Sequence, residues 1–242
     1  MTLLELRRRY QLHYSSLGQR ETRDHAAELA VGGDFEAVGA LEYYALKAHG
    51  LAINHRVVDV GCGTGRLSVQ LARRGHEHYA GFDLMPEAVD HARAICRRPD
   101  WTFAVTDGLQ IATSDGAADF VCFFSVFTHV AHEHTYLYLQ ESKRVLQAGG
   151  LVVFTFLEFK IPSHWVQFEA AILGFGREVE PIVFLDRAAI RSFAARLDLE
   201  VLALVDGDVP TFPIEEPITW EDGRVMHGRG YLGQSLAVLR KR

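Results

Sequence analysis

Apolar and polar positions follow a repeating order along residues 56–157. Short runs such as VVDV and FVCFF are almost continuously apolar, which is typical of strands buried on both faces of a sheet. The segments between them read as helices, and the alternation of strands with helices predicts a doubly wound α/β fold with a mostly parallel sheet. We expect strands at 56–60, 77–82, 101–105, 119–124 and 150–157, with helices at 64–74, 86–97 and 133–147.

Two further helices are predicted ahead of the first strand. Residues 2–17 place Leu3, Leu6, Tyr10, Tyr14 and Leu17 at helical spacing, and 35–50 form a second helix that Gly50 stops. We therefore expect a helical N-terminal cap over 1–50 and the main domain over 51–242. The first helix either packs on the body as an amphipathic helix or covers a ligand, with Tyr10 or Tyr14 reaching the pocket.

The alternation breaks at 158–185, a segment rich in aromatic residues. An insertion at the ligand edge of the sheet predicts a lid or an acceptor-binding element, and the alternative is a helix that only packs on the sheet. A helix at 186–197 follows. Residues 199–206 and 232–240 are expected as the last two strands, antiparallel to each other, and the long loop between them is a second candidate wall for an acceptor.

The first predicted strand leads into a glycine-rich loop. Asp59 is followed by Gly61, Gly63 and Gly65, and a helix begins directly after them. Glycine lets the backbone approach a ligand closely, and the helix N-terminus presents unpaired N–H groups there. The loop therefore predicts a nucleotide-like cofactor.

The spacing of the glycines bears on which cofactor binds. In the dinucleotide fingerprint G-x-G-x-x-G the third glycine would fall at position 66, which is Arg66. A pyrophosphate is disfavoured by a nearby carboxylate, whereas Asp59 would attract a cofactor that carries a sulfonium and an amino group. A nicotinamide or flavin site and a purely structural turn remain the alternatives for this motif alone.

The loop resembles the first motif of the class I S-adenosylmethionine (SAM) dependent methyltransferases, D-x-G-x-G-x-G, at all four positions. The resemblance extends over roughly 54–160 and more loosely over 183–242. It implies a Rossmann-like, mostly parallel seven-stranded sheet whose last strand is antiparallel. It also implies SAM as the cofactor and S-adenosylhomocysteine (SAH) as the product.

Further candidate site residues follow the second, third and fourth strands. Asp83 lies where an acid accepts hydrogen bonds from ribose hydroxyls, a feature that nicotinamide enzymes share. The resemblance implies that Asp107 receives the adenine amino group and that Ser125 and Phe127 flank the methionine part. The expected cofactor site comprises Asp59, Gly61, Cys62, Gly63, Thr64, Gly65, Asp83, Leu84, Met85, Thr106, Asp107, Gly108, Ser125 and Phe127.

Methyl transfer from a sulfonium is an in-line displacement, which requires positioning and exclusion of water rather than a covalent enzyme intermediate. A general base helps where the acceptor is a hydroxyl or a protonated nitrogen. We expect His129 to serve as base or to orient the acceptor, with Tyr14 as a second catalytic candidate. The alternative for His129 is a ring that bonds the backbone and fixes its loop. Glu158 and His227 are lower-ranked pocket candidates.

Composition narrows the function classes. The net charge of −6 disfavours a nucleic-acid partner, which needs clustered Lys and Arg. The three cysteines lack C-x-x-C spacing, so we expect no disulfide framework or zinc site and a cytoplasmic location. The loose spacing of His129, His132 and His134 predicts no metal. No run of 18 apolar residues occurs, so no membrane association is expected.

These observations predict a SAM-dependent methyltransferase that acts on O or N of a small-molecule metabolite, as a monomer or homodimer. A protein or RNA methyltransferase is the alternative among enzymes using SAM. A non-catalytic SAM-binding regulatory or scaffold protein is the alternative outside catalysis. A nicotinamide-dependent oxidoreductase is opposed by Arg66 in place of the third glycine.

Overall fold

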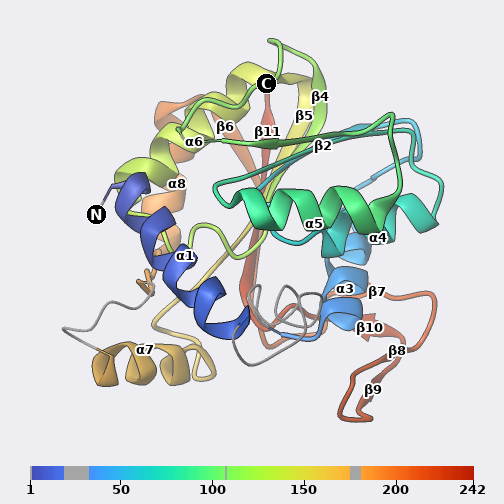
Figure 1. The fold of residues 1–242 in the computed structure, drawn as a ribbon. Coiled ribbons are helices and arrows are strands. Elements are labelled where there is room, and N and C mark those ends of the chain that lie inside the picture. The colour runs from blue at the N-terminus through green and yellow to red at the C-terminus, as the bar shows by residue number, and fades with distance from the viewer. Residues whose placement is uncertain (1, 19–32, 107, 175–180) are drawn as a thin grey trace.

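The computed structural model describes residues 2–18, 33–106, 108–174 and 181–242, with only the backbone described at 13–18. Seven strands form one sheet in the order β3-β2-β1-β4-β5-β11-β6, and only β11 runs antiparallel to its neighbours (Figure 1). The predicted doubly wound sheet with an antiparallel last strand is confirmed. The strands are β1 (Arg56–Val60), β2 (His78–Asp83), β3 (Thr102–Val105), β4 (Ala118–Phe123), β5 (Leu146–Phe156), β6 (Leu199–Val205) and β11 (Ser235–Lys241).

The strand order reverses between β1 and β4. The chain moves outward from β1 to β3 and then returns to pair β4 with the other side of β1. In open α/β sheets such a switch leaves a crevice beyond the carboxyl ends of the strands, and ligands bind there.

Helices cover both faces of the sheet and bury two apolar cores. One core gathers side chains of α3 (Phe35–Ala48), α4 (Arg66–Arg73) and α5 (Pro86–Cys96). The other gathers side chains of α6 (His132–Val145) and α8 (Arg187–Arg196). Apolar residues point alternately from each strand into the two cores, which explains why the strand sequences are apolar throughout.

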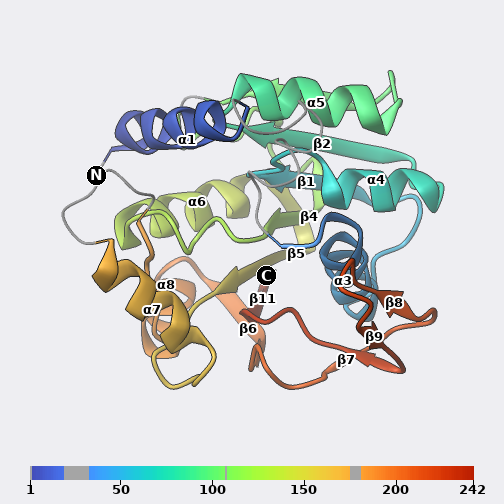
Figure 2. The ribbon, with the colours of Figure 1, turned by 60° about the horizontal axis from the view of Figure 1, so that its bottom comes forward.

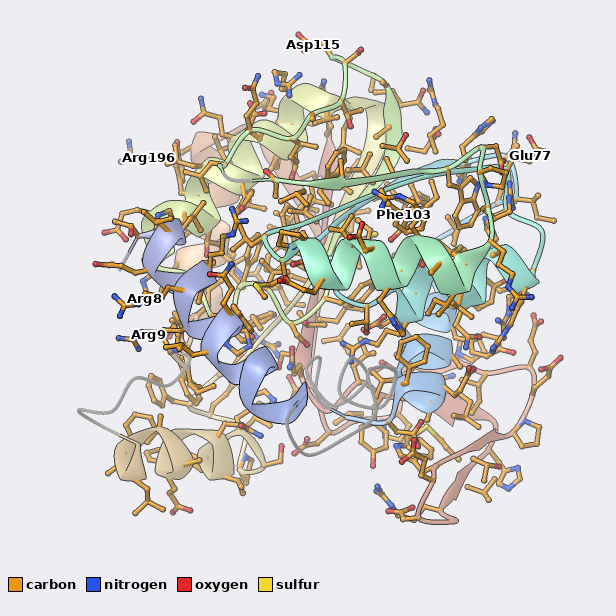
Figure 3. The ribbon with its side chains drawn as sticks, in the orientation of Figure 1. Arg8, Arg9, Glu77, Phe103, Asp115 and Arg196 are labelled. Atoms are coloured by element: carbon orange, nitrogen blue, oxygen red, sulfur yellow. The ribbon has the colours of Figure 1, made fainter. Side chains whose placement is uncertain are left out.

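The two N-terminal helices occupy separate places. The helix α1 (Leu3–Gly18) lies apart from α3 in both views (Figures 1 and 2). Leu3 and Leu6 of α1 are buried in the second core, while Arg8 and Arg9 point away from the molecule (Figure 3). The division of the chain at residue 50 stays a prediction, but the two helices do not stack as a single cap.

The expected start of β5 is wrong by several residues. The expected helix ran over 133–147 and the expected strand began at 150, whereas α6 ends at Val145 and β5 begins at Leu146. Leu146 pairs with Ala118 and Leu151 pairs with Phe120, so the intervening residues form a bulge. Gly149 has a φ of 79°, and its left-handed backbone serves this bulge instead of a helix cap.

The segment 158–185 contains the helix α7 (His164–Leu173) and then returns to the sheet. Val183 N donates to Thr128 O at 2.8 Å, and Leu185 N donates to Leu157 O at 2.9 Å. The returning residues 181–185, called the strap below, therefore lie along the loop that follows β4.

The loop between β6 and β11 is folded into two small hairpin-like sheets. These pair β7 (Phe212–Pro213) with β10 (Arg229–Gly230), and β8 (Ile218–Thr219) with β9 (Val225–Met226). They pack against α3, and none of their residues lines the cavity described below, so the suggestion that this loop walls an acceptor pocket stays a prediction. Its apolar side chains Phe212, Ile214 and Ile218 complete the first core.

Candidate cofactor and active site

A cavity of about 350 Å³ lies at the carboxyl ends of β1, β2 and β4, where the strand order reverses. Its volume is within the usual range of small-molecule sites. The glycine loop forms its floor, and Leu3, Leu6 and Tyr10 of α1 line it from another side. The prediction that α1 covers a ligand pocket, rather than only packing on the body, is supported by this placement.

The glycine loop has the backbone that the sequence predicts. Gly61, Gly63 and Gly65 have φ values of 78°, 52° and 97°, which L side chains rarely adopt. Gly61 N and Cys62 N both donate to Phe82 O, which fastens the loop to the end of β2. A methyl group added at Gly61 would collide with the Cγ2 atom of Val126, so the loop and the segment after β4 approach too closely for any other residue.

Asp83 ends β2 and holds the loop in place. Its Oδ2 accepts from Gly63 N at 2.9 Å, and its Oδ1 accepts from Met85 N at 2.9 Å. Burial raises the pKa of this carboxyl, while the backbone N–H groups act in the opposite direction. Each carboxylate oxygen offers more than one acceptor position, so Asp83 keeps capacity for a ribose hydroxyl.

Asp59, the residue before the last of β1, lies in a much less polar setting. Its side chain is 3% exposed, and the Tyr79 hydroxyl donates to its Oδ2 at 2.8 Å. Burial and the nearby Glu42 carboxylate raise the pKa of Asp59 to about 7. A cation in the cavity would favour the ionised form, so this carboxyl suits a positively charged ligand.

The loop after β4 is held by three side chains around Ser125. Ser125 has a φ of 59°, and its N donates to Thr155 Oγ1 at 2.7 Å. Thr128 Oγ1 donates to Ser125 O, and Gln234 Nε2 donates to Ser125 Oγ at 3.1 Å. A strained residue that neighbours fix at a cavity wall is typical of a functional site.

His129 lies at the cavity between α1 and the strap. Its Nδ1 is 2.9 Å from Pro181 O, and its ring meets the edge of Tyr10 with centroids 5.9 Å apart. Because a carbonyl only accepts, Nδ1 carries the hydrogen, and in the neutral ring Nε2 then carries the lone pair. The backbone-bonding role of His129 is therefore present, together with the tautomer that a base requires.

The cavity brings together most of the predicted cofactor residues. Its lining includes Asp59, Gly61, Cys62, Gly63, Thr64, Asp83, Leu84, Met85, Thr106 and Ser125. Three predicted residues are not part of that lining. Phe127 is buried in the second core, stacked on Phe123 with centroids 4.6 Å apart; Gly65 caps α4; and Gly108 lies away from the wall.

Two predicted residues cannot be placed, and two others lie away from the cavity. Asp107 and the Tyr14 side chain are outside the described residues. Glu158 is buried and binds both ends of the Arg187 guanidinium, with distances of 2.8 and 2.7 Å. His227 is exposed between β9 and β10.

Of the three histidines after β4, His129 and His132 each contact a backbone carbonyl of the strap. His132 Nε2 is 2.9 Å from Phe184 O, so this residue also ties the strap to the start of α6. Across the described residues, no group of three or more His, Cys, Asp or Glu side chains is arranged to hold a metal ion. In the same part of the chain, no helix is both long and apolar enough to cross a membrane.

Sequence reasoning missed one charged pair at the cavity wall. Glu42 of α3 is 2% exposed, and its Oε1 accepts from Arg66 Nε at 2.7 Å. Both residues line the cavity. The sequence of α3 does not identify Glu42 as buried. A single acid within EYYALKA looks the same as a solvent-facing residue until the position of α4 is known.

Comparison with known proteins agrees with this geometry. Residues 57–150 match a family described as a methyltransferase domain. The chain is 28% identical over 193 residues to the 2-methyl-6-phytyl-1,4-hydroquinone methyltransferase of Synechocystis sp., a match that covers 73% of this chain and 56% of that protein. It is 28% identical over 131 residues to a ubiquinone biosynthesis O-methyltransferase of Methylococcus capsulatus, with 53% and 54% covered.

The fold is also shared with solved structures. Magnesium protoporphyrin IX methyltransferase from Synechocystis, crystallised with SAH, superposes with a TM-score of 0.59 at 16% identity, over 86% of each chain. The chain therefore resembles methyltransferases in sequence over residues 57–150, and it shares the fold of SAM-dependent methyltransferases. It spans about half the length of the curated relatives that it matches.

The residues at the cavity fit the cofactor of this family. Asp83 lines the cavity at the end of β2, where a ribose contact is expected, the glycine loop allows a close backbone approach, and buried Asp59 favours a cation. Thr64 Oγ1 is buried at the wall and has no hydrogen-bond partner within the described part of the chain, as expected of a group that a ligand would satisfy. The structural relative binds SAH, and the residues at this cavity fit the same cofactor.

Proposed function

We propose that the protein transfers the methyl group of SAM to an oxygen or nitrogen of a small-molecule acceptor. The observation that carries the proposal is the second wall of the cavity. Besides the glycine loop, the cavity is lined by Leu3, Leu6 and Tyr10 of α1 together with Ile182 of the strap. A largely apolar wall of this kind suits a compact, partly apolar acceptor more than an extended polar chain.

The comparisons support a small acceptor. The matched relatives are named for a phytyl hydroquinone and for ubiquinone biosynthesis, and the structural relative is named for a magnesium porphyrin. The hydroquinone and the porphyrin are both small ring compounds. The net charge of −6 adds an argument against an RNA acceptor, because that partner needs a basic surface.

SAM supplies an activated methyl group with a neutral thioether as the leaving group. The chain has to hold the acceptor atom in line with that group and keep water out. We assign His129 to the acceptor side, where its Nε2 lone pair would take the proton of a hydroxyl or ammonium. The Pro181 carbonyl keeps the ring in that tautomer, and Tyr10 packs against its edge.

Two measurements made one after the other, cofactor binding and then turnover, test the proposal. Calorimetry should give micromolar affinity for SAM and SAH and no binding of NADH. A panel of hydroxylated and amino-substituted ring compounds should then yield SAH with at least one acceptor. Tight SAM binding without turnover on any small molecule, peptide or RNA would favour a non-catalytic SAM-binding protein instead. Methylation of RNA or protein alone would contradict the small-molecule assignment.

A further inference from the structure

The segment around α7 presents a strongly apolar surface to solvent. Of the ten residues of this helix, His164 is the buried one. The helix lies at the rim of the molecule, outside the helices that cover the sheet (Figures 1 and 2). A concentration of exposed apolar side chains marks a place where a ligand or a partner binds. The exposed large apolar side chains of this segment are Phe159, Trp165, Val166, Ile172 and Leu173.

Four aromatic side chains form a cluster at the start of α7. This aromatic cluster consists of Phe159, Trp165, Phe168 and Phe184. The rings of Phe159 and Phe184 stack with centroids 4.3 Å apart, and Phe168 meets both of them edge-on at 5.3 and 5.7 Å. Despite these contacts, Phe159 is 52% exposed and Trp165 is 44% exposed. The aromatic cluster therefore keeps an open apolar face.

Hydrogen bonds hold the aromatic cluster in place. Trp165 Nε1 donates to Phe159 O at 2.7 Å. His164 Nδ1 accepts from Glu158 N at 2.9 Å, and His164 Nε2 lies 3.1 Å from Gly233 O, which fastens the start of α7 to the sheet. Because rings that are already fixed lose little freedom when a ligand binds, the aromatic cluster is preorganised for an apolar ligand.

The strap connects the aromatic cluster with the cofactor cavity. Ile182 lines the cavity, and Phe184 belongs to the aromatic cluster. Phe184 forms a β-bridge with Leu157, so the strap is extended there. Side chains two residues apart in an extended segment point to the same side. Ile182 and Phe184 therefore form one apolar surface that leads from the cavity wall to the exposed rings.

This surface begins beside the residue that we assign to the acceptor. His129 Nδ1 is 2.9 Å from Pro181 O, the neighbour of Ile182. The cavity of about 350 Å³ is near the small end of the range for one ligand, so it leaves little room for a whole acceptor beside SAM. An acceptor whose reacting atom lies at His129 thus has the strap next to it as its apolar way out of the cavity.

The charge of α7 also bears on what covers the aromatic cluster. Glu169 is the one carboxylate of this helix, and no lysine or arginine accompanies it there. A surface of this kind does not attract anionic lipid headgroups, which need basic residues. Continuity with the cavity favours a part of the acceptor itself as the occupant, because a second copy of the chain would not require it.

We propose that the acceptor is a ring compound with a long hydrocarbon chain, and that this chain leaves the cavity past Ile182 and lies on the aromatic cluster. The inference deepens the proposed function and rests on it, because the reacting ring has to lie in the cavity. Each methylene removed from water strengthens binding by about threefold to fourfold. The aromatic cluster would therefore select acceptors by chain length, while His129 acts on the ring.

Calorimetry with three 4-alkylphenols on protein saturated with SAH tests the inference. The probes are 4-methylphenol, 4-butylphenol and 4-octylphenol, used below the concentration at which they form micelles. We expect at least about tenfold tighter binding of the octyl than of the butyl compound. Equal affinity for these two, or no binding of the octyl compound, would overturn the inference while SAH binding leaves the proposed function standing. Absence of SAH binding would instead reject the proposed function.

Substitutions of the exposed rings then locate the chain. Phe159→Gln and Trp165→Gln should each weaken 4-octylphenol by about fivefold or more and leave 4-methylphenol and SAH within about twofold. The matched control is Leu173→Gln, which removes an apolar side chain that is 78% exposed on the same helix but lies outside the aromatic cluster. This control should bind 4-octylphenol as the unaltered protein does. An equal loss in Leu173→Gln would show unspecific adsorption to α7, and the inference would be wrong.

Two further measurements test the other occupants of the aromatic cluster. Sedimentation velocity should give the same mass for the unaltered protein and for Trp165→Gln. A dimer that this substitution converts into a monomer would show an interface between copies of the chain instead. Flotation with vesicles of phosphatidylcholine and phosphatidylglycerol should leave the protein unbound. Vesicle binding that Trp165→Gln abolishes would assign the aromatic cluster to a membrane surface and overturn the inference.

Discussion

At the scale of single residues, Asp83 is the clearest candidate for a direct cofactor contact. Asp83→Ala should weaken SAM binding by about 1.5–3 kcal/mol, because a charged hydrogen-bond acceptor is lost. The same carboxylate also accepts from Gly63 N and Met85 N, so the loss should lie toward the upper end of this range. Calorimetry measures it directly, and unchanged affinity would remove Asp83 from the site.

The Asp59 carboxylate is expected to strengthen SAM binding and to lower the folding stability of the protein without ligand. Its pKa is raised from 3.8 to about 7, so between these pH values the unfolded chain releases a proton that the folded protein keeps. Stability without ligand therefore falls as pH rises through that window, by at most about 4 kcal/mol from this group. Asp59→Asn should remove this dependence and still accept from Tyr79.

Two measurements check the Asp59 prediction. Urea unfolding without ligand should show Asp59→Asn more stable than the unaltered protein by roughly 1–3 kcal/mol at pH 8, and by less at pH 5. The variant should also bind SAM about tenfold more weakly while losing less affinity for SAH, which lacks the sulfonium charge. A variant that is less stable at pH 8 would contradict the argument.

Variants of His129 distinguish base catalysis from a role in positioning the strap. If its Nε2 takes the acceptor proton, His129→Ala should keep SAM affinity and lose turnover by about 100-fold or more. The bond from Nδ1 to Pro181 O means that the variant also releases the strap. His129→Gln is therefore the second variant, since its amide can donate to that carbonyl but cannot act as a base. Full activity in either variant would exclude base catalysis.

The site residues that could be read from the sequence are the local ones. Asp59, the glycines and Asp83 occupy fixed positions relative to strand ends, and the chain direction alone places them at one edge. Phe127 was assigned to the same edge, but the loop after β4 turns back and its ring fills the core. Glu42 meets Arg66 only through the packing of α3 on α4, which no local pattern encodes.

At the scale of elements, two glycines with similar backbones serve different purposes. Gly61 and Gly149 have φ values of 78° and 79°, but a methyl group meets Val126 at Gly61 and nothing within 4 Å at Gly149. Gly149→Ala should cost only about 1 kcal/mol of unfolding free energy and leave SAM affinity unchanged. Gly61→Ala should abolish SAM binding, because the loop and Val126 must separate. Equal binding by both variants would contradict this contrast.

Strands and helices were predictable from the sequence where burial determines the order of apolar and polar residues. The alternating strands and helices from β1 to β4 lie within a few residues of their expected bounds, since strands buried on both faces leave a continuous apolar signal. The start of β5 was misplaced because LQAGG resembles a helix end, while the pairing of Leu146 with Ala118 across the sheet makes it a bulged strand. Long-range pairing overrode the local signal.

At the scale of the whole molecule, Glu158 joins three distant segments. It follows β5, accepts from Arg187 of α8 at two atoms, and accepts from Ser235 Oγ of β11 at 2.5 Å. The sequence offered Glu158 as a pocket candidate because it comes just after a strand. The structure instead places it beneath the strap, outside the cavity lining, where the antiparallel strand meets the rest of the sheet.

The position of Glu158 predicts that its substitution lowers the stability of the whole protein without changing SAM binding at the cavity. Glu158→Ala removes two hydrogen bonds of the Arg187 guanidinium, which keeps only Asp206 and Leu204 O among the described residues, and leaves the buried Ser235 hydroxyl without its acceptor, so unfolding free energy should fall by about 2–4 kcal/mol. For a chain of 242 residues, that corresponds to a drop of roughly 5–15 °C in Tm. Below the transition, SAM affinity by calorimetry should match the unaltered protein, as should that of Glu200→Ala, a surface control paired with Arg240. Weaker SAM binding with unchanged Tm would indicate that Glu158 belongs to the binding site after all.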